Sequence, residues 1–161
     1  MQQINTEITN HTNNDEMDKI NLFIGKNQKF YQEKFRKMNT TGKNISWNWA
    51  AFFFSIYWMI YRKMYFKAAA FFVLISVASY TPYIGVVLNF AILIGISVYA
   101  HALYLDHIEQ SMKKIDALSS GNKEEIIMKK GGTNLPAAMG IGIVHQLLGV
   151  LLLVVALGIS M

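Results

Sequence analysis

The chain has 161 residues, of which 53% are hydrophobic, with a formal net charge of +5 and no cysteine. The lack of cysteine excludes disulfides and thiolate metal sites, and this hydrophobic fraction is too high for a small soluble domain unless the apolar residues are concentrated in runs. Such runs exist, because residues 68–101 and 131–161 contain no Asp, Glu, Lys or Arg. A bilayer core of about 30 Å needs roughly 20 apolar helical residues, so we predict an all-α integral membrane protein.

The N-terminal part is polar and then basic. Residues 1–20 are rich in Asn and Thr and lack the apolar stretch of a secretory signal, which predicts a flexible polar tail. Residues 21–43 interleave aromatic side chains with Lys and Arg, which predicts an amphipathic cytoplasmic helix. Basic and aromatic residues also mix on nucleic-acid-binding surfaces, but beside membrane spans the pattern favours anionic lipid headgroups, and we predict no nucleic-acid partner.

The membrane domain is predicted to cover residues 44–161 and opens on an aromatic segment, WNWAAFFFSIYWMIYRKMYF, residues 47–66. It holds all three tryptophans and ten of the 21 aromatic residues. Aromatic rings concentrate where a bilayer meets water, whereas span centres are aliphatic. The residues predicted to lie at this interface, facing lipid, are Trp47, Trp49, Trp58, Arg62 and Lys63.

The distribution of positive charge bears on whether residues 45–61 cross the membrane. Seven Lys and Arg residues precede residue 44, three lie between 62 and 67, and five lie between 113 and 130. A crossing at 45–61 would divide them seven against eight and give almost no orientation bias, whereas without it all fifteen lie on one face, which the positive-inside rule makes cytoplasmic. We therefore predict an interfacial or re-entrant helix there and a cytoplasmic N-terminus.

The apolar runs that follow predict three spans. Pro82 and Gly85 interrupt the first run and divide it into a hairpin of spans at 65–80 and 84–104. A cytoplasmic helical insert is predicted over 105–132, and the last span over 134–160.

Local signals define the insert. Ile108, Met112, Ile115 and Leu118 recur at helical spacing, which extends the preceding helix with an amphipathic face. A second short helix is predicted to start at a capping box formed by Asn122 and Glu125 and to end at the glycine pair 131–132. Pro136 suits the first turn of the last span.

Polar residues inside the predicted spans are candidate functional residues because each is costly in hydrocarbon without a partner. These are Asn89, His145 and Gln146, and Asn89 is a candidate hydrogen-bond partner for His145. Gly142, His145 and Gly149 share one helix face that another helix could approach closely. A proton or ion relay through His145 is one interpretation. A packing contact is favoured, because no predicted span contains Asp or Glu.

Four further segments can be considered together: FIGKNQKFYQEKF, WNWAAFFFSIYWMIYRKMY, YAHALYLDHI and KKGGTN. They resemble the domain of unknown function 2628 family of small bacterial inner-membrane proteins, and the resemblance runs from about Asn21 over nearly the whole chain. Ser55 departs from it, since a glycine is expected in the F-F-F-G pattern. The resemblance implies a location and an architecture but no catalytic residue.

The sequence contains no H-E-x-x-H, G-x-S-x-G, Walker or G-x-G-x-x-G motif, and we predict no catalytic, cofactor-binding or metal-binding residues. His101 and His107 are six residues apart, which disfavours a two-histidine metal site on one helix. We predict a non-enzymatic multi-pass inner-membrane protein that interacts with membrane lipid and with a second copy or another membrane protein. The alternatives are a small channel or transporter component using Asn89 and His145, or an immunity-type membrane protein.

Overall fold

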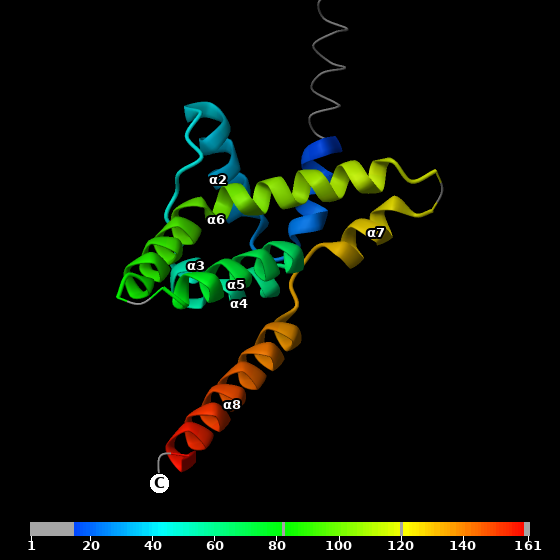
Figure 1. Ribbon diagram of the computed structural model, residues 1–161. Helices are drawn as coiled ribbons and strands as arrows, with labels where there is room; N and C mark the ends of the chain where they lie inside the picture. The colour runs from blue at the N-terminus through cyan, green and yellow to red at the C-terminus, as the bar shows by residue number, and fades with distance from the viewer. Residues whose placement is uncertain (1–14, 82, 120, 160–161) are drawn as a thin grey trace, which may run out of the picture.

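The computed structural model describes residues 15–81, 83–119 and 121–159, and within these ranges the chain forms helices and no strand (Figure 1). This confirms the all-helical class. The helices are an unlabelled one at residues 15–24, then α2 (Gln28–Thr41), α3 (Trp49–Phe54), α4 (Ile56–Tyr61), α5 (Tyr65–Ser79), α6 (Gly85–Asp116), α7 (Lys123–Lys130) and α8 (Leu135–Ile159).

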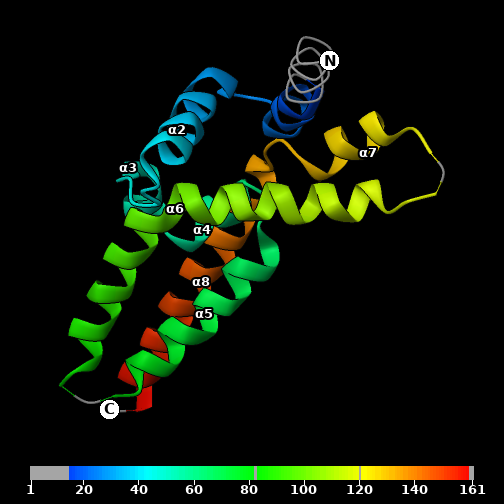
Figure 2. The same cartoon turned by 90° about the horizontal axis from the view of Figure 1, so that it is seen from above.

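The helices separate into an apolar group and a polar group. Figure 2 shows α5, the first part of α6 and α8 running in a common direction, while α2, α7 and the helix at 15–24 gather at the other end around the second part of α6. Among the described residues, two stretches are long and apolar enough to cross a bilayer, within Gly85–Asp116 and within Lys123–Gly158. Helix α5 is apolar but has only 15 residues.

Figure 2 shows that helix α6 changes direction partway along its length. Near the bend, the Ser97 hydroxyl donates to the Leu93 carbonyl at 2.7 Å. The backbone N–H groups of Ser46 and Asn48 donate to the carbonyls of Val98 and Ser97, both at 3.0 Å. A chain segment bonded to helix carbonyls, together with a serine that bonds back four residues, is a known cause of helix bending.

The aromatic segment forms two short helices rather than the single helix predicted over 45–61. Asn48 caps α3 by accepting from the Ala51 N–H at 3.0 Å. The chain then breaks at Ser55, whose backbone has φ 42° and ψ −113°, before α4 begins. Each helix has six residues and measures about 9 Å, so neither is long enough to cross a bilayer. The break falls at the position where the family resemblance implies glycine, the residue that tolerates positive φ.

The N-terminal predictions require two corrections. Residues 1–14 of the predicted tail lie outside the described residues, but 15–24 are helical. The single helix predicted over 21–43 is interrupted, because Gly25 and Asn27 adopt left-handed conformations with φ 65° and 70°. The turn lets Phe23 and Ile24, at 1% and 0% exposure, enter the core from one helix while α2 contributes Tyr31 and Phe35.

The local helix signals predicted in the C-terminal part are observed, whereas the cytoplasmic location of 105–132 and the membrane crossing of 134–160 stay predictions. Asn122 accepts from the Glu125 N–H at the start of α7, and Gly131 follows its last residue. Pro136 lies in the first turn of α8. The hairpin between α5 and α6 is present, although Pro82 itself lies outside the described residues.

Candidate functional site

Arg62 lies immediately after α4 and is only 3% exposed, which is unusual for a charged residue. Its guanidinium carbon lies 4.5 Å from the ring centroid of Tyr31, 5.1 Å from that of Tyr104 and 5.6 Å from that of Tyr61. Its Nη1 donates to the Ile24 carbonyl at 3.4 Å. We call Arg62 with Tyr31, Tyr61 and Tyr104 the arginine cage; it joins α2, α4 and α6.

Among the described residues, no carboxylate forms an ion pair with this arginine. The ion pairs among the described residues join Lys19 to Asp116 and Lys67 to Asp106. Within the same part of the chain, neither Arg62 Nε nor the Tyr104 hydroxyl has a hydrogen-bond partner. The cation is therefore held by aromatic faces and one carbonyl, an environment that suits the weakly hydrated guanidinium better than an ammonium. Burial raises the pKa of the Tyr31 phenol, and the nearby Arg62 charge opposes that shift.

A second polar contact lies beside the cage at the bend of α6. His101 is 1% exposed, and its Nδ1 lies 3.3 Å from the Ser46 carbonyl. Its Nε2 lies 3.5 Å from Asn48 Nδ2. The imidazole thus connects α6 to the residues that lead into α3, and its ring also packs against those of Phe30 and Tyr31.

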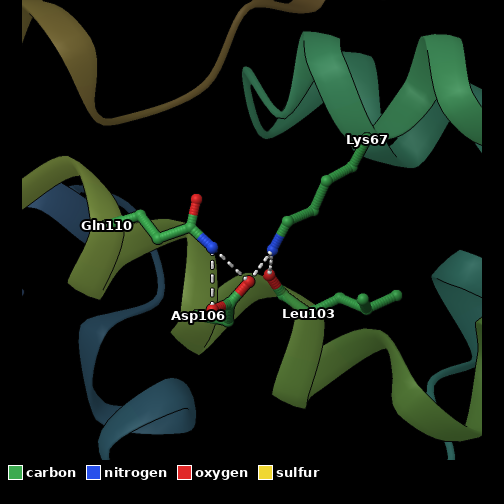
Figure 3. A network of polar contacts seen from close by, with 4 residues as sticks. All are labelled: Lys67, Leu103, Asp106 and Gln110. Atoms are coloured by element: carbon green, nitrogen blue, oxygen red, sulfur yellow. Dashed lines mark hydrogen bonds and ion pairs between the residues drawn. The ribbon is translucent and has the colours of Figure 1, made fainter.

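An ion pair fastens the start of α5 to α6 (Figure 3). Lys67 Nζ lies 2.5 Å from Asp106 Oδ2 and donates to the Leu103 carbonyl at 2.7 Å. Gln110 Nε2 donates to both oxygens of the same carboxylate. The bonds from Lys67 and Gln110 lower the pKa of Asp106, with partial burial acting the other way. Lys67 is thus held in a hydrogen-bonded network at the start of α5.

The predicted interfacial residues divide into two groups. Trp47 and Trp49 are 38% and 63% exposed, and Lys63 is half-buried. Trp58 and Arg62 were predicted to face lipid, and this is wrong, because they are 5% and 3% exposed. The break at Ser55 turns α4 inward, so that Trp58 packs against Tyr104 with 6.3 Å between ring centroids.

The predicted intramembrane residues have separate partners. Asn89 Nδ2 donates to Ser79 Oγ at 2.9 Å across the α5–α6 hairpin. A hydrogen bond of 2.6 Å joins His145 Nδ1 to the Tyr57 hydroxyl. The pairing predicted between Asn89 and His145 is therefore replaced by two others.

The two glycines predicted to share one face of α8, Gly142 and Gly149, have different surroundings. A Cβ at Gly142 would lie 3.7 Å from the Tyr57 ring, so this residue faces α4 of the same chain, whereas nothing lies within 4 Å of the corresponding position at Gly149. Gln146 is exposed on the same helix.

Sequence reasoning missed the residues that surround Arg62. Tyr31 was assigned to an interfacial face and Tyr104 to the end of a span, and no local pattern pairs them. Only Tyr61, which directly precedes Arg62, could have been associated with it from the sequence. The part of the chain that the structure describes contains no group of three or more His, Cys, Asp or Glu residues placed to hold a metal ion.

Comparison with known proteins gives one result. Residues 14–112 match the model of a family described as "Protein of unknown function (DUF2628)". The match ends before α7, so Gly131, Gly132 and all of α8 lie beyond it. No curated protein and no solved structure matches the chain.

Proposed function

The chain belongs to this family of unknown function, and on that premise we propose that it is a multi-pass bacterial inner-membrane protein that acts by binding. In this proposal it catalyses no reaction. It holds anionic lipid at its cytoplasmic face and docks a second copy or another membrane protein through α8. The arginine cage then serves as the rigid joint between the cytoplasmic helices and the membrane.

The observation that carries the proposal is the exposed apolar surface of α8. The large apolar side chains along this helix have exposures between 47% and 69%, and from Ile143 to Leu157 they lie on every side of it. Soluble monomers rarely expose continuous apolar patches of this extent, and such patches mark membrane or partner contacts. These side chains include Ile141, Ile143, Leu147, Val150, Leu151, Leu152, Leu153 and Val154.

Three helices are proposed to span. The 25 residues of α8 measure about 37 Å, and the 15 of α5 about 22 Å. Helix α5 therefore requires a locally thinner bilayer, in which the longer α8 would tilt. The first part of α6 returns alongside α5, and their polar side chains pair at Asn89 and Ser79.

The aromatic segment is proposed to lie at the cytoplasmic interface. Trp47, Trp49, Phe53 and Phe54 expose large rings, and aromatic rings of this kind concentrate at headgroup depth. The helices α3 and α4 pack on α6 and on α5 and α8 respectively, so the segment lies between the polar and apolar groups.

Thiol accessibility tests this topology, because the chain has no cysteine of its own. We expect Tyr83→Cys, fully exposed in the turn between α5 and α6, to react with a membrane-impermeant maleimide in intact spheroplasts. Thr40→Cys and Lys113→Cys, both exposed, should react only after lysis. The reverse pattern would contradict the orientation. Labelling of Thr40→Cys but not Lys113→Cys from outside would show that the aromatic segment crosses.

The docking role of α8 has its own test. Gly149→Leu should weaken self-association or partner capture in a bilayer two-hybrid assay, since this position opens to free space. Gly140→Leu is the matched control: it is equally open but lies nine residues away, on the opposite helix face. Equal effects of the two variants would contradict a specific face.

A further inference from the structure

A basic cleft lies between the residues that connect α4 to α5, the middle of α6 and the residues that connect α7 to α8. Its volume is about 430 Å³. Three lysines, Lys63, Lys129 and Lys130, line it together with His107 and the hydroxyl of Ser111, and none of the lining residues is Asp or Glu. A cleft of this size that offers ammonium, imidazole and hydroxyl donors without a carboxylate suits a phosphate group.

Contacts within the chain fix the shape of the cleft. Lys63 has a left-handed backbone, φ 58°, and its Nζ donates to the Lys129 carbonyl at 2.9 Å. Asn134 donates from its backbone N–H to the Tyr61 carbonyl at 2.8 Å and from Nδ2 to the Tyr65 hydroxyl at 2.9 Å. The Lys63 ammonium is therefore positioned by its bond to α7, whereas Lys129 and Lys130 are exposed at the edge of the cleft.

The location of the cleft indicates which phosphate it takes. Tyr65 is the first residue of α5, and Asn134 immediately precedes α8, so two apolar helices begin at the rim. The next residue, Leu135, lines an apolar pocket of about 450 Å³ with Tyr57, Tyr61 and Met139. A polar cleft and an apolar pocket on one helical turn match a molecule with an anionic head and a hydrocarbon chain.

We propose that this cleft binds the phosphate of one anionic phospholipid, with an acyl chain lying along the first turns of α8. The inference rests on the membrane insertion proposed above. It adds a defined binding site to the general attraction proposed between the cytoplasmic face and anionic lipid. The headgroup phosphate contacts Lys63, Lys129 and Lys130, and His107 adds a donor that depends on pH.

The experiment measures the binding of phosphatidylglycerol to the full chain in neutral-detergent micelles. The reference is phosphatidylcholine, a zwitterionic lipid whose phosphate charge is balanced by its own ammonium group. The variant Lys129→Gln/Lys130→Gln removes two charges from the cleft. The control Lys26→Gln/Lys37→Gln removes two exposed charges outside its lining. We expect the cleft variant to lower the affinity for phosphatidylglycerol about tenfold and the control less than about twofold.

A second variant controls for the possibility that the double lysine variant loses affinity through impaired folding. Ser111→Asp keeps every lysine but adds a carboxylate to the cleft, and it should also lower the affinity at least about fivefold while the helical circular dichroism stays unchanged. A competition measurement then tests soluble phosphates. Neither inorganic phosphate nor glycerol 3-phosphate should displace the bound lipid at millimolar concentration.

Each other outcome has a distinct meaning. Equal losses in the cleft variant and the control would overturn the site but leave the proposed binding to anionic lipid intact. Displacement by inorganic phosphate would show a free-phosphate site and overturn the lipid as occupant. Equal binding of phosphatidylglycerol and phosphatidylcholine by the unaltered chain would overturn both the site and the lipid-binding part of the proposed function.

Discussion

The guanidinium of Arg62 stacks over the ring of Tyr31, with 4.5 Å between its central carbon and the ring centroid. This contact joins the residue after α4 to α2, two parts of the chain that no sequence pattern connects. A desolvated cation on an aromatic face contributes about 2 kcal/mol, and the rings of Tyr61 and Tyr104 add further faces.

Arg62→Lys should therefore destabilise the protein although the charge is kept. The ammonium is more strongly hydrated and cannot stack, so we expect a loss of about 1–3 kcal/mol in the free energy of unfolding. Denaturant unfolding in neutral detergent, followed by tryptophan fluorescence, measures it. Arg36→Lys on the exposed face of α2 is the control and should change little. An unchanged midpoint for Arg62→Lys would show that the cage contributes packing but no cation–aromatic energy.

Ser55→Gly should stabilise the chain. Serine is strained at φ 42°, and its buried hydroxyl has no hydrogen-bond partner among the described residues. Relief of both costs should outweigh the greater flexibility of glycine in the unfolded chain and raise stability by about 1 kcal/mol. Ser55→Ala separates the two effects, because it removes the hydroxyl and keeps the backbone strain. Equal gains in the two variants would mean that the backbone at this position is not strained.

These two residues mark how far sequence reasoning extends. The apolar runs, the capping box at Asn122 and the glycine stop after α7 were predictable, because composition and local hydrogen bonding determine them. The burial of Arg62 was not, because an arginine beside aromatic residues at a membrane boundary fits an exposed interfacial position equally well. Its burial depends on the break at Ser55, a long-range consequence of how α3 packs on α6. The family pattern contained the only advance sign of that break, a glycine expected at Ser55.

Gly131→Ala should destabilise the protein substantially. A Cβ at this position would lie 2.7 Å from Phe23 Cα and closer still to the Phe23 carbonyl oxygen, and both are backbone atoms that cannot rotate away. The adjacent Gly132 N–H donates to that same carbonyl at 2.6 Å, so the clash would also separate α7 from the helix at 15–24. We expect a loss of about 1–3 kcal/mol in detergent unfolding experiments. Gly140→Ala, in open space on α8, is the matched control and should be neutral or slightly stabilising. A neutral Gly131→Ala would contradict the close approach of the two backbones.

The ion pair between Lys67 and Asp106 should make stability fall in acid. Lys67 and Gln110 lower the pKa of Asp106 in the folded protein. The ion pair therefore adds to the free energy of unfolding at pH values above the ordinary carboxyl pKa, and this addition is lost as the pH falls through the lowered pKa of the folded state. The carboxylate is half-exposed, so the contribution should stay below about 1 kcal/mol. Carboxyl groups have ordinary pKa values of about 4, so Asp106→Asn should remove this part of the pH dependence between about pH 5 and 3. Asp116→Asn is the control, because Asp116 belongs to an exposed ion pair with a distance of 4.0 Å. Identical pH profiles for the unaltered chain and Asp106→Asn would argue against the pair.

The affinity of the basic cleft for phosphatidylglycerol should rise as the pH falls from about 7.5 to 5.5, a range in which histidine but not lysine titrates. Burial, followed by the charge of Lys67, lowers the pKa of His107, and Asp106 partly opposes them. The imidazole is therefore neutral at pH 7.5 and gains its proton at a pH below the ordinary pKa of histidine. Its protonation adds a cation beside Lys63, Lys129 and Lys130. Lys114 acts in the same direction as Lys67, and the lowered pKa of Asp106 keeps its carboxylate charged over this range. His107→Gln should bind with an affinity that hardly changes with pH, close to that of the unaltered chain at pH 7.5. A rise in affinity that persists in His107→Gln would assign the titration to a different group and remove His107 from the headgroup site.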